Sequence, residues 1–293
     1  MTRNFSYFQS SFPIAATVFL LGLAAAAARA DVTLLGRQTV SAGRAAPVSA
    51  AVTLSYQGAN TRLESLGAPT LIYDGKANIL YGVNTARRTY AITVPVPPDP
   101  ADEISLDPDE VKIETTLDLH RTALTRTLAG LAAHQYLVSG TVTFTRLRPA
   151  RLEARNDQEA EQEREGRRRR SAAFIAPVWT IRGEIWLADA RKFPAKENTL
   201  LAAQLVAVSA GPFQQPLADA LDKYAGLPLL AQVVVTHVPA RLPPVPVVTV
   251  TSWTVRSVSE APLAPKLFQA PLAYTLVAAP LTPYAPGLLT PLP

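Results

Sequence analysis

Residues 61–90 read TRLESLGAPTLIYDGKANILYGVNTARRTY and contain three short runs of strand-forming residues separated by two turns. Asp74-Gly75 begins the first hairpin loop and supplies the backbone geometry that a tight turn needs. Three consecutive strands joined by short turns form a meander, and a meander must bury one of its faces. The stretch therefore predicts a curved antiparallel sheet, and it contains no pattern that indicates catalysis.

The first 30 residues predict an export signal. Arg3 provides a positive charge, residues 14–28 are an apolar run, and Ala28-Arg29-Ala30 matches a small-x-small cleavage pattern. The 15-residue run is shorter than the ~20 residues that span a bilayer, so we expect cleavage after residue 30 in preference to an uncleaved anchor. No later segment is long and apolar enough to span. We expect an exported protein, periplasmic or extracellular, with no transmembrane segment after cleavage.

The composition excludes several kinds of chemistry. The chain has no cysteine, which excludes disulfides, thiolate metal sites, cysteine catalysis and lipid attachment at a mature N-terminal cysteine. The formal net charge is +5, and loss of Arg3 and Arg29 with the signal leaves 5 − 2 = +3. This surplus is too small to indicate nucleic-acid binding. The 26 prolines and 17% charged residues suit a β-rich fold with many proline-containing loops.

Strand-like alternation recurs along the rest of the chain. Residues 178–188, VWTIRGEIWLA, are the longest example, with Trp179, Ile181, Ile185 and Leu187 on one face. Strands are expected at residues 31–37, 48–56, 61–66, 71–73, 79–81, 89–94, 111–119, 125–128, 134–144, 178–188, 229–237 and 247–258. Helices are expected at residues 199–209 and 216–224, the second ending at Gly226.

This pattern predicts one mainly β (α+β) domain over residues 31–279, with about ten or eleven strands and one or two helices. A sheet of this size must curve or close, and a helix fits against its concave side.

Three segments do not fit the sheet pattern. Residues 95–110 form an acidic, proline-rich loop, and residues 280–293 form a proline-rich tail that we expect to be disordered. Residues 149–172 form a charged insertion, because positions 151–170 hold seven arginines against six acidic residues and almost nothing apolar.

The arginine-rich part of this insertion, residues 164–170, permits two interpretations. It could touch anionic lipid headgroups or envelope polymers. We favour the alternative, in which the glutamates at positions 159, 161, 163 and 165 neutralise the arginines within the same loop.

Several short patches, taken in order along the chain, resemble exported bacterial domains related to the periplasmic outer-membrane lipoprotein carrier (lipoprotein-sorting) superfamily. The patches are residues 62–64, 70–74, 79–81, 89–90, 183–188, 226–229 and 258–274, the last ending with Phe268, Pro271 and Tyr274. The resemblance covers residues 50–275 in scattered pieces. It implies an open, strongly bent antiparallel half-barrel capped by helices, whose apolar concavity holds acyl chains in the carriers. This chain departs from the carriers through its charged insertion and its long proline-rich loops.

The histidines and carboxylates of the chain do not form the patterns that are typical of metal sites or catalytic sites. His120, His134 and His237 lie far apart in strand-like runs and lack metal-ligand spacing. The carboxylate pairs Asp107/Asp109 and Asp219/Asp222 fit solvated surfaces. No G-x-S-x-G, P-loop or G-x-G-x-x-G occurs. We therefore expect no catalytic residues, metal site or cofactor, and do not expect an enzyme.

Two functions remain at this stage. In the first, Trp179, Ile181, Ile185 and Leu187 line the concavity of an exported, lipoprotein-carrier-like protein that binds a lipid or an acylated protein. In the second, the protein is a structural or interaction module that fills its cavity with its own helix and contacts an envelope protein. An open pocket of several hundred Å³ favours the first function, and a filled cavity favours the second.

Overall fold

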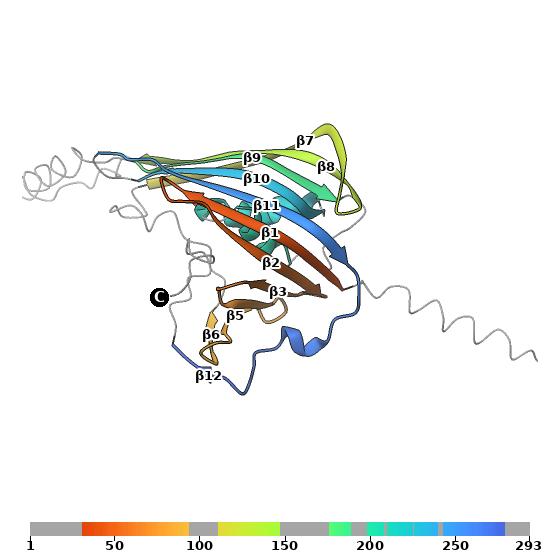
Figure 1. The fold of residues 1–293 in the computed structure, drawn as a ribbon. Coiled ribbons are helices and arrows are strands. Elements are labelled where there is room, and N and C mark those ends of the chain that lie inside the picture. Colours follow the sequence, from red (N-terminus) through yellow and green to blue (C-terminus); the bar gives the residue numbers. More distant parts are fainter. Residues whose placement is uncertain are drawn as a thin grey trace, which may run out of the picture.

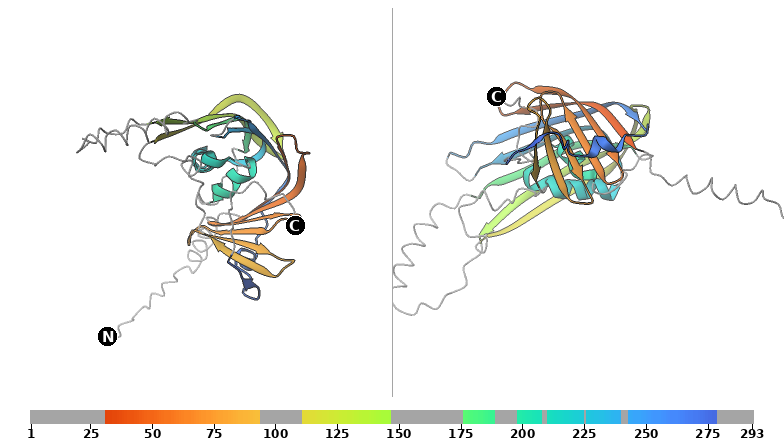
Figure 2. Two further views of the ribbon diagram at one scale, coloured as in Figure 1. Left: turned by 90° about the vertical axis from the view of Figure 1, so that its left-hand side faces the viewer. Right: turned by 90° about the horizontal axis from the view of Figure 1, so that it is seen from below.

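The computed structural model describes residues 31–93, 111–146, 176–188, 198–207, 210–224, 226–239 and 243–278. These residues form one sheet that bends around two helices, as Figures 1 and 2 show. The predicted export signal, the loop at 95–110, the charged insertion at 149–172 and the tail at 280–293 lie outside the described residues.

The sheet is open and has the strand order β12-β6-β5-β4-β3-β2-β1-β11-β10-β9-β8-β7. All neighbouring strands are antiparallel except β12 and β6, which are parallel. The strands are β1 (Val32–Ala42), β2 (Val48–Gln57), β3 (Asn60–Ser65), β4 (Thr70–Asp74), β5 (Ile79–Asn84), β6 (Thr89–Thr93), β7 (Val111–Leu128), β8 (Leu131–Arg146), β9 (Val178–Ala188), β10 (Leu227–Val238), β11 (Val247–Ser259) and β12 (Thr275–Leu276).

The mainly β class and the curved antiparallel sheet agree with the sequence prediction, but the strand number does not. The described residues contain 12 strands, more than the predicted ten or eleven. The added strand is β12, which has two residues and forms only because the chain after β11 returns to the edge of β6. Residues 111–119 and 125–128, predicted as separate strands, belong to one strand with an irregularity between Arg121 and Thr125.

Residues 61–90 form an antiparallel meander as predicted, but with four strands, β3, β4, β5 and β6, where the stretch was interpreted as three runs and two turns. Asp74 fixes the loop between β4 and β5, because its Oδ1 accepts hydrogen bonds from the backbone N–H groups of Lys76 (3.0 Å) and Ala77 (3.1 Å). One face of the meander joins the main core through Leu63, Leu71 and Leu80. The strands thus alternate between an inner and an outer face.

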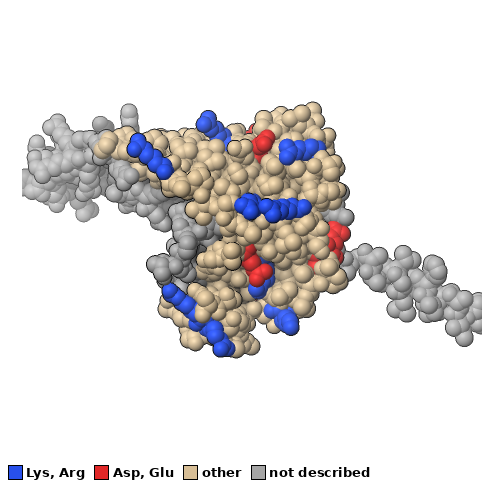
Figure 3. All heavy atoms as spheres, viewed as in Figure 1, with Lys and Arg blue, Asp and Glu red and all other residues tan. Residues whose placement is uncertain are grey.

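Two helices lie on the concave side of the sheet, where the left view of Figure 2 shows them inside its curve. They are α3 (Thr199–Val206) and α4 (Gln214–Tyr224), and the short 3₁₀ turn η5 (Gly211–Phe213) precedes α4. Both helices were expected at these positions. Charged side chains are sparse on the opposite, outer face of the sheet, as Figure 3 shows.

The segment after β11 forms a strap across the outer face of the meander. Its 3₁₀ turn η6 (Pro265–Phe268) places Phe268 against Ile72 and Val83, and these three side chains form a second, smaller core. Leu263 N–H donates to Asp31 Oδ2 over 2.6 Å, which ties the strap to the start of β1. The strap lets the meander bury apolar side chains on both faces.

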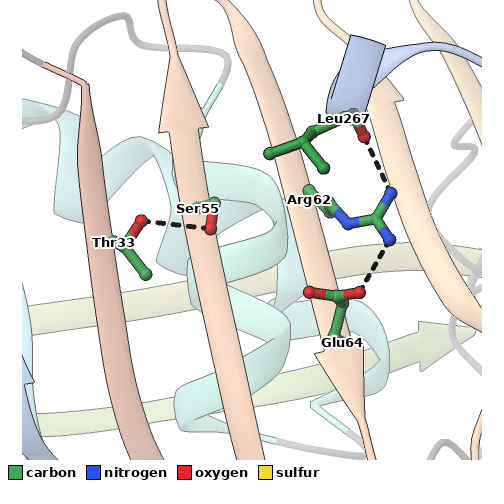
Figure 4. A network of polar contacts seen from close by, with 5 residues as sticks. All are labelled: Thr33, Ser55, Arg62, Glu64 and Leu267. Carbon is green, nitrogen blue, oxygen red and sulfur yellow. Dashed lines mark hydrogen bonds and ion pairs between the residues drawn. The ribbon is translucent and has the colours of Figure 1, made fainter. Parts of the chain in front are cut away.

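The charged side chain of Arg62 is mostly covered by the strap. Its side chain is 18% exposed and donates to the backbone carbonyl of Leu267 in the strap (2.7 Å) and to Glu64 (2.6 Å), as Figure 4 shows. On the neighbouring strand pair, the hydroxyls of Thr33 and Ser55 lie 3.3 Å apart. The strap covers this part of the outer face, and the local alternation along β3 gives no sign of it.

Gly36 and Trp253 form the tightest contact between β1 and β11. Trp253 is fully buried, and its indole Nε1–H donates to the Pro228 carbonyl over 2.8 Å. A Cβ at position 36 would lie 2.3 Å from Trp253 Cη2 and 2.6 Å from the Thr254 carbonyl oxygen. Only glycine leaves room for the indole at this point.

We predict that Gly36→Ala lowers the free energy of unfolding by about 3 kcal/mol, because the methyl group overpacks the indole and a neighbouring carbonyl. Urea unfolding of the chain from Asp31 onward measures the change. Thr39→Ala on the outer face of the same strand is the control and should change stability by about 0.5 kcal/mol or less. Equal stability of Gly36→Ala and the parent protein would contradict the packing described here.

Candidate functional site

The four residues predicted to line a binding concavity all face the helices. Trp179 is 8% exposed, Ile181 and Leu187 are 1% exposed, and Ile185 is 0% exposed. All four belong to the main hydrophobic core. The predicted face of β9 is therefore the concave face, and the helices of the chain cover it.

Trp179 is enclosed from two sides. The imidazole of His237 on β10 stacks on its indole, with ring centroids 3.9 Å apart and planes 14° apart. On another side, a Cβ at Gly211 in η5 would lie 2.9 Å from Trp179 Cη2. The close approach of η5 leaves no room for a ligand over that part of the ring.

Helix α3 is the element that occupies the middle of the concave side. It packs on β10, β11 and α4. Residues 198–207 contain no charged residue, and all of them except Leu200 are buried. A helix that is apolar on all sides is typical of a buried element. Here α3 lies where an apolar ligand of the sheet would lie.

Buried side-chain amides hold α3 at both ends. Gln38 on β1 donates to the carbonyl of Leu205 over 2.5 Å, near the end of the helix. At the start of the helix, Asn198 donates to the Asn60 carbonyl (3.2 Å) and to Thr61 Oγ1 (2.8 Å). These bonds satisfy polar groups that would otherwise be buried without a partner.

Helix α4 is joined to α3 and to the far edge of the sheet. Gln214 Nε2 donates to the Leu200 carbonyl over 3.1 Å. At the other end of α4, the Tyr224 hydroxyl donates to the Leu119 carbonyl of β7 over 2.8 Å. The Tyr224 ring also packs against Tyr136 with centroids 4.8 Å apart. The two helices therefore close the concave side as a connected unit.

One small cavity lies between α3 and the sheet. Its volume is about 10 Å³, and it is lined by Gln38, Val52 and Leu63 on the sheet and by Gln204 and Leu205 on α3. About one water molecule fits in a cavity of this size. An acyl chain does not fit in this cavity.

The outer face carries a different kind of hollow. A depression of about 650 Å³, open to solvent, crosses β7, β8, β9 and β10. Its lining residues include Thr116, Asp118, Thr141, Thr180 and Arg182. It combines these polar groups with apolar surface.

Alternation along β9 puts Glu184 and Trp186 on the face opposite to Trp179. Trp186 is nevertheless buried at 5% exposure, and the guanidinium carbon of Arg126 lies over its ring, 4.7 Å from the centroid. Trp186 is therefore buried although it lies on the outer face.

Burial displaces the pKa of Tyr56. It lies on β2, is fully buried in the main core, and the loss of hydration raises the pKa of its hydroxyl well above 10.0. A raised pKa in the folded state means that the folded protein keeps this proton at a pH where the unfolded chain loses it. Stability from this group is complete below pH 10 and is lost as the pH rises through the folded-state pKa.

We predict that Tyr56→Phe removes part of the alkaline loss of stability. In the parent protein, the ionisation of Tyr56 in the unfolded chain costs about 1.4 kcal/mol of folding free energy for each pH unit above 10.0. Urea unfolding across this pH range should give a shallower slope for Tyr56→Phe. Parallel curves for the two proteins would show that Tyr56 ionises as easily in the folded protein as in the unfolded chain.

The histidines and carboxylates do not assemble into a metal centre within the described part of the chain. No group of three or more His, Cys, Asp or Glu side chains is close enough there to hold a metal ion. Helices long and apolar enough to cross a bilayer are likewise absent from the described residues.

Comparisons with known proteins identify no family. No family model matches the sequence, and no curated protein matches it. Among solved structures, the crystal structure of a LolA superfamily protein from Nitrosomonas europaea aligns with a TM-score of 0.27 and 7% sequence identity. The alignment covers 83% of this chain and 91% of that chain. A likeness of this degree assigns neither a family nor a ligand.

The amide contacts of α3 were not foreseen from the sequence. Asn198, Gln38 and Gln214 are uncharged and isolated in the chain, and nothing in their spacing marks them as partners of α3. The absence of charge over residues 198–207 is the signal that could have identified α3 as a fully buried helix.

We predict that Asn198→Ala lowers the free energy of unfolding by about 1–3 kcal/mol, because the Asn60 carbonyl and the Thr61 hydroxyl lose their donor. Urea unfolding measures the loss. Gln215→Ala is the matched control, because the Gln215 amide also donates to a side chain, Asp219, but at an exposed site. Its effect should stay within about 0.5 kcal/mol. Equal effects of the two substitutions would contradict the proposed role of Asn198.

Proposed function

We propose that this protein is an exported, non-catalytic interaction module of the cell envelope, whose concave face is occupied by its own helices and whose partners bind elsewhere. The observation that supports this proposal is the burial of Trp179, Ile181, Ile185 and Leu187 in the core on the side where the helices lie. Export is inferred from the first 30 residues of the sequence, and the absence of catalysis from its lack of catalytic motifs.

The energetics of α3 favour a filled concavity. Leu201, Leu205 and Val206 are at most 2% exposed. Burying each such side chain stabilises the protein by about 1.5–3 kcal/mol. A ligand that displaced α3 would have to compensate for these contacts and for the hydrogen bonds of Gln38 and Asn198. The arrangement is therefore that of a scaffold stabilised by its own helix.

A second function, an acyl-chain carrier of the lipoprotein-carrier type, is favoured by one specific observation. Residues 198–207 have no charge, so none of their side chains can be held by an ion pair. If α3 withdrew, Trp179, Ile181, Ile185 and Leu187 would line a continuous apolar trough suited to a lipid or to the acyl chain of a modified protein.

Native mass spectrometry of the protein purified from its own envelope separates the two functions. If the protein is an interaction module, we predict that native mass spectrometry gives the mass of the protein without bound lipid. A fluorescent fatty acid added at micromolar concentration should not bind. Gln38→Ala, which removes one amide contact of α3, should also remain free of fatty acid.

Stoichiometric bound lipid would contradict the interaction module and support the carrier. In that case Gln38→Ala should bind the fluorescent fatty acid more tightly than the parent, because less energy is needed to move α3. Gln215→Ala on the exposed face of α4 serves as the matched control, with the affinity of the parent.

A further inference from the structure

Three polar side chains meet on the concave side of the sheet, beside residues of the apolar core. Gln38 on β1, Ser65 at the end of β3 and Gln204 on α3 line the cavity of about 10 Å³ between the helix and the sheet. The buried core residues Val52 and Leu63 line the same cavity. Ser65 follows Leu63 by two positions, so alternation along the strand directs both side chains to the concave face. The fold thus gathers polar groups from three distant parts of the chain in one place.

The hydroxyl of Ser65 is buried without a partner. Its Oγ atom is shielded from solvent, and no group in the described part of the chain forms a hydrogen bond with it. Buried polar groups in folded proteins are nearly always hydrogen-bonded, because an unpaired one loses its hydration and gains nothing in return. We therefore expect a partner for this hydroxyl inside the cavity.

The side-chain amide of Gln38 is only partly used. Its Nε2 donates one hydrogen bond, to the Leu205 carbonyl of α3 over 2.5 Å, and the side chain forms no other hydrogen bond within the described residues. A glutamine amide has a second N–H and a carbonyl oxygen to offer. Gln38 is 3% exposed, so bulk water hardly reaches these groups. Gln38 can therefore bind a small polar ligand in the cavity while it holds α3.

The size and the lining of the cavity select this ligand. A volume of about 10 Å³ accommodates about one water molecule. None of the described residues that line the cavity is charged, so an ion would lie there without a counter-charge, which is costly in a buried site. An apolar group of the same size would leave the Ser65 hydroxyl unpaired. Water satisfies both the volume and the hydrogen bonding.

We propose that one water molecule is bound in this cavity and bridges the Ser65 hydroxyl to the side-chain amide of Gln38. A buried water makes two to four hydrogen bonds, and the polar groups of Ser65, Gln38 and Gln204 line its site. Because Gln38 also donates to the Leu205 carbonyl, the water links β3 through β1 to the end of α3. A bridging water of this kind contributes nearly as much as a direct hydrogen bond to the attachment of the helix.

A crystal structure of the chain from Asp31 onward, at a resolution that shows ordered water, tests this proposal. We expect a single density peak in the cavity, about 2.5–3.2 Å from both Ser65 Oγ and a polar side-chain atom of Gln38.

The effect of Ser65→Ala on stability separates a water-filled cavity from a dry one. With water bound, the substitution removes one of its partners, and the unfolding equilibrium constant from urea unfolding should rise about five-fold or more. In a dry cavity, the same substitution removes an unpaired buried hydroxyl, and the constant should fall or stay unchanged. Ser257→Ala is the matched control at an exposed position of β11, and it should change the constant by no more than about two-fold.

Two results would overturn the proposal. One is a crystal structure of the parent in which the cavity holds no ordered water, or holds a water that does not contact Ser65. The other is a Ser65→Ala variant that is as stable as the parent or more stable. Both measurements report on the cavity beside α3, whereas native mass spectrometry reports whether the concave face holds a lipid. Failure of this proposal is therefore distinguishable from failure of the proposed function.

Discussion

The contact between the charge-free helix α3 and the concave face of the sheet is the interaction on which the rest of this structure depends. An open sheet with an apolar concave face is unstable in water unless something covers that face. Helix α3 provides the cover along β10 and β11, and α4 extends it towards β7. The proposed function rests on the same contact, because the predicted ligand-binding face is the face that the fold uses as its core.

Covering the concave face leaves the sheet with two edges and a large outer face. At one edge, the strap adds β12 to β6 and buries Phe268 against the outside of the meander. Arg62 links the strap to the meander through the Leu267 carbonyl. These contacts stabilise short strands that would otherwise have only one covered face.

Much of the fold could be predicted because its signals are local. The Asp74-Gly75 turn, the alternation in β9 and the periodicity of α4 depend on neighbours in the chain, and each element was found where it was predicted. The face of β9 that holds Trp179 was also assigned correctly, since alternation determines which side chains point the same way.

The rest depends on contacts between residues far apart in the chain. Gln38 meets Leu205, and Arg62 meets Leu267, across separations of 167 and 205 residues. No local sequence pattern predicts such pairs of contacting residues. Trp179 and Ile185 were predicted to line a cavity because their own strand is apolar, but whether that space is open depends on α3, whose position only the folded structure gives. The contact of Arg126 with the Trp186 ring likewise joins residues far apart in the chain.

Hydrogen exchange of the α3 backbone amides in the native protein tests the central claim most directly. If α3 is part of the core, its amides should exchange as slowly as those of β10 and β11, because all of them are released only by global unfolding. Amides of α3 that exchange orders of magnitude faster than those of β10 and β11, while the sheet stays protected, would show that the helix leaves the concave face on its own. That result would contradict the self-filled scaffold.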